Sequence, residues 1–379
     1  MMILPGKTLG MLGGGQLGRM FTMSARTMGY KVIVLDPAEN CPAGEVANLH
    51  IKADYENEVA LAEFGQKCDA VTTEFENVPA KTLRYLTAFT LVHPAAANVA
   101  IAQDRMLEKQ FLRANDFPIG PYANITNHAD IDAALTYIGL PAVIKLCRLG
   151  YDGKGQSIIF NENEAHKIFD ALGKAPCVME KLLPLDLEVS VIVARTTNET
   201  KVYPVSENRH VNAVLDMSIV PARIEKNLAN EVCKIAVNIT EKMNYQGVMG
   251  IEFFIVDGRP FVNEIAPRPH NSGHYSQDAC ITSQFEQQVR TLCSLPLGST
   301  KLLTPVVMIN LLGDLWSQGE PDWREIFCHP QAKLHLYGKH SARPGRKMAH
   351  INCLGNTLDN AIATAEKIKA SLYRKASDN

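Results

Sequence analysis

The first hundred residues alternate short apolar runs with stretches of helical periodicity, and this order constrains the fold more tightly than any other feature. The segments KTLGML and KVIVLD have the composition of buried strands, and residues 16–29 between them carry apolar side chains on one helical face. The alternation continues through a helix at 56–67, the strand DAVTTEF, a helix near 79–88 and the strand FTLVHP. A β-α-β-α order predicts a parallel, doubly wound sheet, which binds ligands at the carboxyl ends of its strands.

The first of these strand ends opens into the glycine-rich turn LGMLGGGQLGRM. Residues Gly13–Gly18 match G-x-G-x-x-G, and Asp36 follows 18 residues after Gly18 at the end of the second strand. This spacing is close to that of dinucleotide sites, so an NAD-dependent oxidoreductase is one hypothesis. The turn also suits another ligand, because the pattern describes a backbone shape rather than a particular cofactor. A second strand end carries TTEFEN, with Glu74 and Glu76.

Composition limits the choice of function. The chain has 379 residues, which is enough for two or three domains, and a formal net charge of -2. This charge gives no reason to expect binding to nucleic acid or membranes, so an anionic ligand needs a local basic patch. The nine cysteines are scattered and include no C-x-x-C pair, which is typical of reduced thiols in the cytoplasm. We expect no membrane span and no secretion signal, because the apolar runs stay below about 18 residues.

A second glycine-rich loop lies between two apolar strands in PAVIKLCRLGYDGKGQSIIF. Gly150, Gly153 and Gly155 allow main-chain N–H groups to approach a phosphate closely. Lys145 and Lys154 add positive charge to the same segment. A flexible basic hairpin is an equally good interpretation. The loop is not a Walker loop, because no G-K-[ST] ends it and no helix follows directly.

Two carboxylates are predicted to face each other on a hairpin formed by GIEFFIV and PFVNEI. If Asp257–Arg259 form a three-residue loop, Glu252 stands opposite Glu264 on the same face. A two-residue loop would pair Glu252 with Asn263 instead. Facing carboxylates among apolar neighbours are costly unless a cation bridges them or one takes a proton. Magnesium bound with a nucleotide would supply that cation, and a charged pair at a sheet edge is the alternative.

The hairpin leads directly into APRPHNSGH, which is too rich in proline and glycine for a regular helix or a central strand. The segment brings four polar side chains within seven residues, namely Arg268, His270, Asn271 and His274. So many donors beside a metal site favour an oxyanion pocket. A loop tied down by its own hydrogen bonds has the same composition.

Three further segments carry weaker signals. NDFPIGPY suits a linker, and Glu188 near a strand start could bind ribose hydroxyls or lie on a solvated turn. The last eighty residues have the pattern of a small strand-rich unit with a closing helix at about 357–371. Within it, SARPGRKMAH places Arg343, Arg346 and Lys347 close together, as a surface cluster or a phosphate clamp.

Taken together, the motifs resemble one known family. They are GGGQLGRM, DR at 104–105, GYDGKGQ, EK at 180–181, GIEFF with VNEIAPRPHNSGH, and RPGRK. This set covers almost the whole chain and is similar to that of the 5-(carboxyamino)imidazole ribonucleotide synthetases, ATP-grasp enzymes of purine biosynthesis. The resemblance implies an α/β (α+β) fold in three parts: a Rossmann-like pre-ATP-grasp domain at 1–104, a two-lobed ATP-grasp domain at 105–300 (lobes at about 115–182 and 183–300), and a small strand-rich C-terminal domain at 301–379.

The resemblance also implies a reaction. ATP phosphorylates bicarbonate to carboxyphosphate, and the exocyclic amine of 5-aminoimidazole ribonucleotide is then carboxylated, with ADP and phosphate as the other products. The implied cofactors are ATP and Mg²⁺, with Mn²⁺ as an alternative ion, and the implied state is a cytoplasmic homodimer. Carboxyphosphate hydrolyses readily, so the glycine loop at 150–155 is expected to act as a lid that excludes water.

By the same resemblance, each candidate residue receives a role. The magnesium ligands are Glu252 and Glu264, and the groups that cradle bicarbonate and carboxyphosphate are Arg268, His270 and Asn271. The residues expected to bind ATP are Arg105, Lys145, Gly150, Tyr151, Asp152, Gly153, Lys154, Gly155, Gln156, Glu180, Lys181, Leu182, Leu183, Glu188, His210, Asn263 and Glu264. The residues expected to bind the acceptor ribonucleotide are Gly15, Gln16, Leu17, Glu74, Glu76, Tyr151, Asp152, Arg343, Arg346 and Lys347.

Three other hypotheses remain open from the sequence. Another ATP-grasp ligase or carboxylase, such as a formate-dependent ribonucleotide ligase or a biotin carboxylase, would share the ATP site. The NAD-dependent oxidoreductase would use the first glycine turn and Asp36, but it leaves GYDGKGQ and the facing glutamates unexplained. A catalytically inactive binding protein could keep the fold, although the intact acidic and basic positions argue against it.

Overall fold

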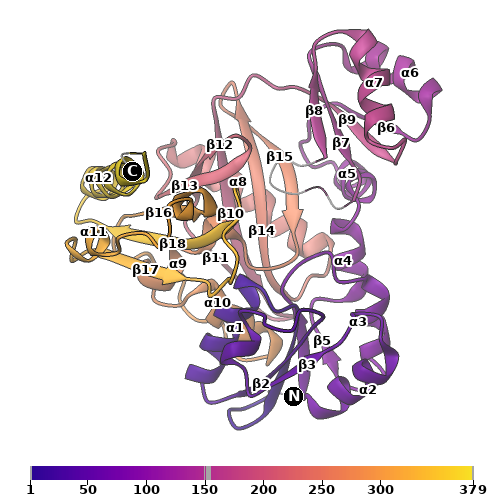
Figure 1. Ribbon diagram of the computed structural model, residues 1–379. Helices are drawn as coiled ribbons and strands as arrows, with labels where there is room; N and C mark the ends of the chain where they lie inside the picture. The colour runs from indigo at the N-terminus through magenta and orange to yellow at the C-terminus, as the bar shows by residue number, and fades with distance from the viewer. Residues whose placement is uncertain (1, 149, 151–154, 378–379) are drawn as a thin grey trace.

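The computed structural model describes residues 2–148, 150 and 155–377 of the chain. The described residues form a five-stranded, a four-stranded and a nine-stranded sheet. Figure 1 shows the N-terminal sheet at the bottom, the four-stranded sheet at the upper right and the nine-stranded sheet between them. The chain therefore passes from one end of the molecule to the other and then returns through its middle.

The N-terminal sheet is parallel and doubly wound, as the alternation predicts. Its strands are β1 (Thr8–Leu12), β2 (Lys31–Asp36), β3 (Leu49–Lys52), β4 (Ala70–Thr73) and β5 (Leu91–Val92), in the spatial order β3-β2-β1-β4-β5 with every neighbouring pair parallel. The helices are α1 (Gln16–Thr27), η1 (Gly44–Val46), α2 (Glu58–Lys67), α3 (Ala80–Leu86) and α4 (Ala96–Ala102). Apolar side chains of α1 pack on one face together with α10 (Gln284–Leu292), and those of α2 and α3 pack on the other.

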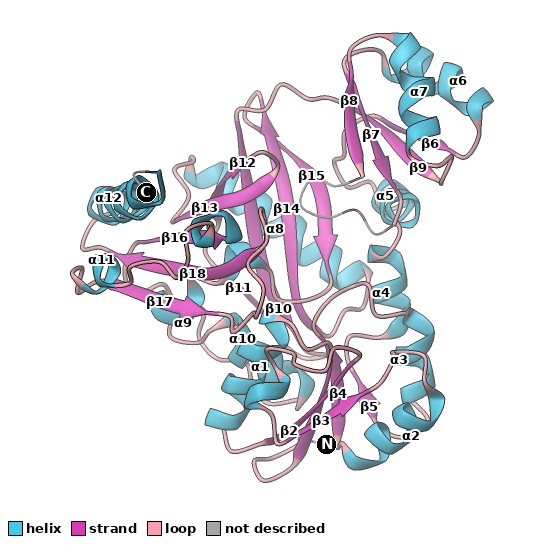
Figure 2. Cartoon of the chain, in the orientation of Figure 1, coloured by secondary structure: helices cyan, strands magenta, loops and turns pink. Residues whose placement is uncertain are grey.

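The four-stranded sheet forms a small lobe with two helices on one side (Figure 2). Its elements are β6 (Tyr122–Ile125), α6 (His128–Ile138), β7 (Ala142–Leu146), β8 (Gln156–Ile159), α7 (Glu162–Ala171) and β9 (Cys177–Lys181), with strand order β6-β9-β7-β8 and antiparallel pairing throughout. Helix α5 (Arg105–Ala114) precedes this lobe and contacts β9.

The nine-stranded sheet forms the second lobe and continues into the last eighty residues. Its strands are β10 (Leu187–Arg195), β11 (Thr200–Val202), β12 (Ser206–Val211), β13 (Val214–Val220), β14 (Gly247–Val256), β15 (Arg259–Ala266), β16 (Val306–Leu312), β17 (Ala332–Leu336) and β18 (Lys347–Leu354). The order is β15-β14-β10-β12-β13-β16-β18-β17, with β11 paired to β10. Because β16 pairs with β13, the strand-rich C-terminal segment extends the same sheet.

The remaining helices cover this sheet and close the chain. They are α8 (Lys226–Lys242), η2 (Asn271–Gly273), α9 (Ser276–Ala279), η3 (Gly313–Trp316), α11 (Arg324–Phe327) and α12 (Leu358–Ser377). The closing helix α12 packs on β16 and β18 and runs further than the predicted 357–371.

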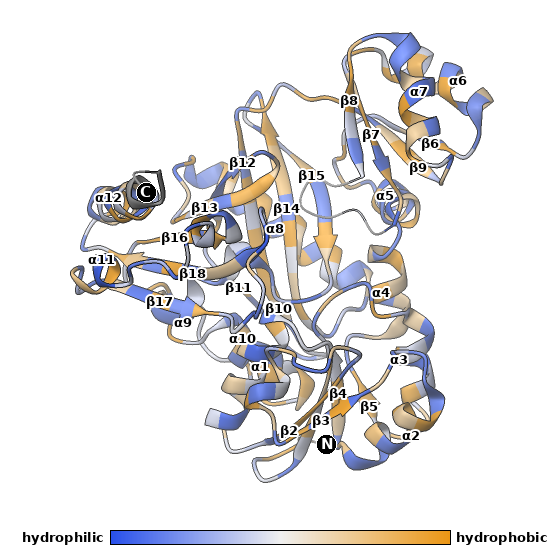
Figure 3. Ribbon diagram, in the orientation of Figure 1, coloured by the Kyte–Doolittle hydropathy of each residue, from blue (hydrophilic) through white to orange (hydrophobic). Residues whose placement is uncertain are grey.

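Hydropathy follows this arrangement. Figure 3 shows apolar residues along β13 and β14, whereas β15 carries a hydrophilic stretch ahead of its apolar C-terminal end. All nine cysteines are free thiols, in agreement with the composition. Within the described part of the chain, no helix combines the length and the apolar character that a membrane crossing requires.

Gly10 of β1 gives a test of the N-terminal packing. A Cβ at this position would lie 2.6 Å from Phe64 Cζ and 2.8 Å from Val71 Cγ2. We expect Gly10→Ala to lower the free energy of unfolding by about 1–3 kcal/mol, measured by urea denaturation, because the core must shift to admit a methyl group. Gly120→Ala is the control, since its Cβ would meet only Leu183 at 3.4 Å. Equal stability of the two variants would contradict the tight contact.

Candidate active site

The amides of the first glycine turn are bound by carboxylates of the protein itself. Asp36 Oδ2 accepts a hydrogen bond from Gly14 N at 2.7 Å. Glu74 Oε2 accepts from Gly15 N at 2.5 Å and from Gly18 N at 3.2 Å, and burial raises the pKa of Glu74 to about 7. A dinucleotide pyrophosphate would need these same amides at the helix N-terminus. The geometry therefore argues against the NAD hypothesis.

Gln16 and Leu17, which lie between Gly15 and Gly18 of this motif, have different surroundings. Gln16 Oε1 accepts from Lys339 Nζ at 2.7 Å, and Lys339 also donates to the main-chain oxygen of Lys347 at 2.6 Å. This contact joins the C-terminal basic segment to the first glycine turn. The side chain of Leu17 is buried beside Tyr337 and contributes to packing. Sequence reasoning missed Lys339, which carries no motif beyond its position shortly before RPGRK.

An ion pair links the N-terminal sheet to the loop that follows β15. Glu76 lies directly after β4, and both of its carboxylate oxygens accept hydrogen bonds from the guanidinium of Arg268. Burial acts to raise the pKa of Glu76, but the charge of Arg268 outweighs it and lowers the pKa. Arg268 also donates to the main-chain oxygen of Pro269 at 3.2 Å. The residue predicted to bind bicarbonate and one predicted to bind the ribonucleotide are thus direct partners.

Glu252 and Glu264 face each other as predicted, but the turn and the strand pairing that bring them together differ from the prediction. Strands β14 and β15 are joined by the two-residue turn Asp257–Gly258, so the predicted three-residue loop is wrong. From that turn alone, Glu252 would pair with Asn263. A β-bulge beside Glu252 takes up Asn263, and Glu252 then pairs with Glu264. The amide of Asn263 donates to Glu252 Oε2 at 3.3 Å.

The two carboxylates lie in different electrostatic surroundings. Burial, followed by the charge of Glu264, raises the pKa of Glu252. Burial also acts to raise the pKa of Glu264, but the charges of Arg105, Lys145 and Arg268 outweigh it and lower that pKa. Arg105 Nη1 lies 3.3 Å from Glu264 Oε2. Glu252 is therefore the less compensated carboxylate of the pair.

His270 lies beside this pair. Its Nε2 is 3.3 Å from Glu252 Oε1, and its Nδ1 is 2.8 Å from Ser272 Oγ. Burial, followed by neighbouring positive charges, lowers the pKa of His270 to about 3, so the ring is neutral. One ligand atom from each of Glu252, Glu264 and His270 lies within 4.8 Å of the others. This donor set fits a hard divalent cation through its two carboxylates.

Helix α5 connects the two lobes through a buried lysine that sequence reasoning missed. Lys109 Nζ lies 3.3 Å from Glu180 Oε2 on β9 and donates to the main-chain oxygen of Asn263 on β15 at 2.9 Å. Lys145 Nζ approaches the other oxygen of Glu180 at 3.0 Å. Burial acts to raise the pKa of Glu180, but these two lysines outweigh it and lower the pKa to about 2. Arg105 and Lys109 stand four residues apart on one helical face, a spacing that could have revealed the lysine.

The other residues predicted to bind ATP surround this lobe junction or lie outside the described residues. Glu188 Oε2 is 3.0 Å from His210 Nδ1, and although burial acts to lower the pKa of His210, its contact with Glu188 raises it overall. Lys181 Nζ donates to the main-chain oxygen of Leu140 at 2.8 Å, so its charge is directed toward the small lobe. Gln156 begins β8 directly after Gly155, Leu182 and Leu183 follow β9, and Gly150 follows β7. Tyr151, Asp152, Gly153 and Lys154 lie outside the described residues.

Asn271 is paired with a residue from the C-terminal part of the sheet. Its Nδ2 donates to Asn310 Oδ1 at 3.0 Å, and Asn310 Nδ2 donates to Asn271 Oδ1 at 2.6 Å. Asn310 lies on β16, and both side chains are buried. This reciprocal pair uses one N–H and one oxygen lone pair of the Asn271 amide, which leaves one of each for a substrate. Sequence reasoning missed Asn310, an amide in an otherwise apolar strand.

The three basic residues of SARPGRKMAH lie at different depths. Arg343 is exposed, and Arg346 Nη1 donates to the main-chain oxygen and hydroxyl of Ser341 at 2.7 and 2.9 Å. Lys347 begins β18 and is half-buried, and its positive charge contributes to the lowered pKa of His270. The structure thus brings Lys347 toward the carboxylate pair and leaves Arg343 on the surface.

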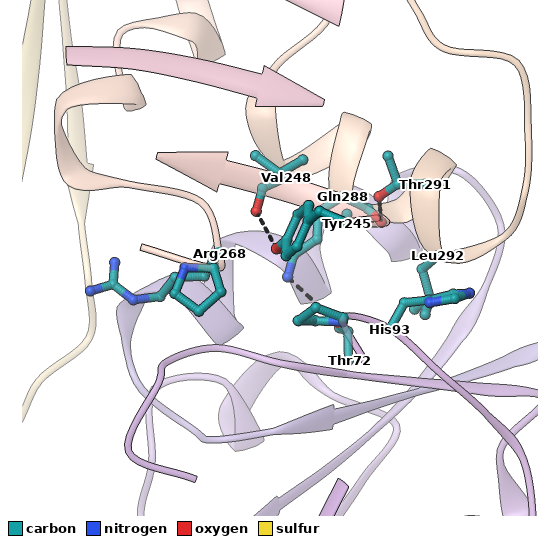
Figure 4. A pocket seen from close by; sticks show the side chains of 11 residues that line it. Thr72, His93, Tyr245, Val248, Arg268, Gln288, Thr291 and Leu292 are labelled. Carbon is teal, nitrogen blue, oxygen red and sulfur yellow. Dashed lines mark hydrogen bonds between the residues drawn. The ribbon is translucent and has the colours of Figure 1, made fainter. Parts of the chain in front are cut away.

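A small cavity lies where the N-terminal domain packs against the later part of the chain. Thr72, Tyr245, Arg268 and Gln288 are among the residues that line it. Figure 4 shows the guanidinium of Arg268 directed away from this cavity, while Gln288 Nε2 donates to Thr72 Oγ1 at 3.4 Å across the boundary. The carboxylate pair does not line the cavity.

The fold and site define an ATP-grasp enzyme: two lobes meet at a buried Lys–Glu junction beside a carboxylate pair. The family model of the ATP-grasp domain matches residues 110–285. The model described as Ribonucleotide synthetase preATP-grasp domain matches 6–103, and that described as Phosphoribosylaminoimidazole carboxylase C-terminal domain matches 306–364. The chain belongs to the N5-carboxyaminoimidazole ribonucleotide synthase family, so the resemblance drawn from the motifs is confirmed.

Individual relatives match over nearly their whole length. The chain is 41% identical over 362 residues to N5-carboxyaminoimidazole ribonucleotide synthase of Bacillus subtilis (strain 168), covering 95% of this chain and 94% of that protein. A crystal structure of an N5-carboxyaminoimidazole ribonucleotide synthetase with ADP superposes with a TM-score of 0.93 at 40% identity, covering 99% of both chains. The Aspergillus clavatus enzyme, solved with ADP and 5-aminoimidazole ribonucleotide, gives 0.89 at 28% identity over 97% of this chain and 99% of that one.

The lobe junction predicts a pH-dependent contribution to stability. We expect Glu180→Gln to lower the free energy of unfolding at neutral pH by about 3–5 kcal/mol, because two lysines lose their buried countercharge. The lowered pKa of Glu180 means that its ionised form stabilises the fold above the ordinary value of 4.5, and that this contribution is lost as the pH falls toward about 2. Urea denaturation at about pH 7 and about pH 3 should therefore show the difference between wild type and variant shrinking in acid.

The exposed pair Glu63–Lys67 supplies the control. Its side chains are 56% and 48% exposed, so Glu63→Gln should change stability by less than about 0.5 kcal/mol. A Glu180→Gln variant as stable as this control would mean that the junction is solvated.

Proposed function

We propose that this chain carboxylates 5-aminoimidazole ribonucleotide with bicarbonate at the expense of ATP, with carboxyphosphate as the intermediate. The observation that carries the proposal is the half-buried Glu252–Glu264 pair between two lobes, in a chain of this family. The products would be N5-carboxyaminoimidazole ribonucleotide, ADP and phosphate. Positioning and charge neutralisation are the main requirements of such phosphoryl transfer, and the site supplies both.

We assign the nucleotide to the junction of the lobes. Arg105, Lys145 and Lys109 supply positive charge there, and Glu180 aligns both lysines. Glu252 and Glu264 fit Mg²⁺ or Mn²⁺, because two half-buried carboxylates with unequal compensation need a cation. A nucleotide-bound Mg²⁺ would neutralise the phosphate oxygens and both carboxylates.

We assign bicarbonate and the acceptor ribonucleotide to the space between this junction and the first glycine turn. Arg268 would orient the bicarbonate while Glu76 aligns its guanidinium. Lys347 would neutralise the ribonucleotide phosphate, supported by Lys339, which ties the segment to Gln16. Asn310 holds the amide of Asn271, whose remaining N–H would donate to the bicarbonate.

The decisive experiment measures ADP release from the purified chain with ATP and Mg²⁺. We expect release that depends on bicarbonate and 5-aminoimidazole ribonucleotide together, with N5-carboxyaminoimidazole ribonucleotide identified by mass spectrometry. Release that needs a different carboxylate or amine would assign the chain to another ATP-grasp reaction. We also propose a homodimer, for which light scattering should give twice the chain mass of 41.7 kDa.

Removing one carboxylate tests the metal assignment. We expect Glu264→Gln to lower kcat by at least about a hundredfold, because a neutral amide replaces an anionic ligand. The matched control is Glu286→Gln on α10, where the carboxylate pairs with Arg290 four residues away. Near-wild-type turnover of Glu264→Gln would remove the residue from the metal site.

Removing Lys347 separates the two nucleotide sites. Lys347→Ala should raise KM for 5-aminoimidazole ribonucleotide by about tenfold or more while KM for ATP changes little, because one charged contact to the phosphate is lost. Lys333→Ala removes an exposed lysine of β17 and serves as the control. An equal rise in both KM values would place Lys347 elsewhere in the site.

A further inference from the structure

A chain of buried hydrogen bonds runs from His270 into the largest sheet. Ser272 Oγ lies 2.8 Å from His270 Nδ1, and Ser190 Oγ of β10 lies 2.6 Å from Ser272 Oγ. Ser190 Oγ also lies 2.8 Å from Ser206 Oγ and 2.9 Å from Asn208 Nδ2. Asn208 Oδ1 in turn lies 2.9 Å from Ser218 Oγ. The three strands β10, β12 and β13 and the turn η2 contribute these side chains, none of which is more than 5% exposed.

Donors at both ends set the direction of these bonds. The main-chain N–H of Ser272 points at His270 Nδ1 over 3.4 Å, so that nitrogen must accept. At the other end, the amide of Asn208 donates to Ser190 Oγ while its oxygen accepts from Ser218. Ser190 can then donate its single proton to Ser272, and Ser272 can donate to His270 Nδ1.

We propose that Ser272 is a positioning residue that keeps His270 Nδ1 an acceptor and directs the Nε2 proton at Glu252. His270 Nε2 lies 3.3 Å from Glu252 Oε1. A nitrogen that carries a proton has no lone pair for a metal, so His270 orients Glu252 and is not a third ligand beside the two carboxylates. This inference rests on the proposed function only in its assignment of Glu252 to the metal.

The arrangement restrains Glu252 through both of its oxygens. His270 approaches Oε1, and the amide of Asn263 donates to Oε2 at 3.3 Å. Because the serines behind His270 are buried, their hydrogen bonds act in a low dielectric and support one another. The sheet thereby sets the plane of a carboxylate that must meet the nucleotide.

The tautomer of His270 can be measured without substrate. We expect nitrogen NMR of the ¹⁵N-histidine-labelled, nucleotide-free protein to show His270 protonated at Nε2 and unprotonated at Nδ1, with the signal assigned by its loss in His270→Asn. In Ser272→Ala the Nδ1 resonance should move toward that of a nitrogen without a hydrogen bond. A wild-type ring protonated at Nδ1, or an Nδ1 resonance unmoved by Ser272→Ala, would overturn the proposal.

Kinetics supply the second measurement. We expect Ser272→Ala to lower kcat by about tenfold while KM for ATP changes by less than about twofold. Ser190→Ala, one step further from the ring, should shift the Nδ1 resonance in the same direction and also tests the proposal if Ser272→Ala fails to fold. Thr240→Val is the control, because it removes a buried hydroxyl that donates to the main-chain oxygen of Val237 within α8, away from the serine network.

The two proposals fail in different ways. If the chain does not carboxylate 5-aminoimidazole ribonucleotide, the proposed function is wrong, whereas the NMR result still decides the tautomer. If the activity is present but Ser272→Ala behaves as Thr240→Val in both measurements, only the positioning role of Ser272 is wrong.

Discussion

Glu252 and Glu264 lie side by side on the β14–β15 hairpin, and the rest of the site must balance their two negative charges. Glu252 and Glu264 repel each other, and burial strengthens that repulsion. Their compensation comes from Arg105 on α5, Lys145 on β7 and Arg268 after β15. These elements lie far apart along the chain, so the pair is tolerable only when both lobes are in place. A bound cation would complete the compensation and so stabilise the folded state.

The loop after β15 is held by contacts from several parts of the molecule. Glu76 of the N-terminal domain binds Arg268, and Gln284 at the start of α10 bonds both the main-chain N–H and oxygen of His270. Asn310 of β16 pairs with Asn271. Apart from the single turn η2, this segment rich in proline and glycine has no regular secondary structure to position its side chains. Its geometry therefore depends on neighbours from the N-terminal sheet, the ATP-grasp sheet and the C-terminal strands.

Sequence reasoning was strongest where periodicity and turn chemistry act locally. It predicted the parallel N-terminal sheet and the two hairpins, because alternation and glycine turns report backbone conformation directly. It predicted that Glu252 faces Glu264, but from a three-residue turn that does not exist. A β-bulge adds the residue that restores this pairing, and nothing in the local sequence predicts a bulge at Asn263. Lys109, Lys339 and Asn310 were missed because their partners lie 39 or more residues away in sequence.

The amino-acid sequence by itself determined the alternation of strands and helices, the first glycine turn, the hairpin and, through its motifs, the family. These properties depend on neighbouring residues, whose spacing is visible in one dimension. Only the tertiary structure decided what occupies the first glycine turn, which charges compensate Glu264, and which ring nitrogen of His270 faces Glu252. Each of these depends on burial and on contacts between distant segments. The physical reason is that desolvation and hydrogen-bond direction belong to an environment, and the environment forms only when the sheets pack together.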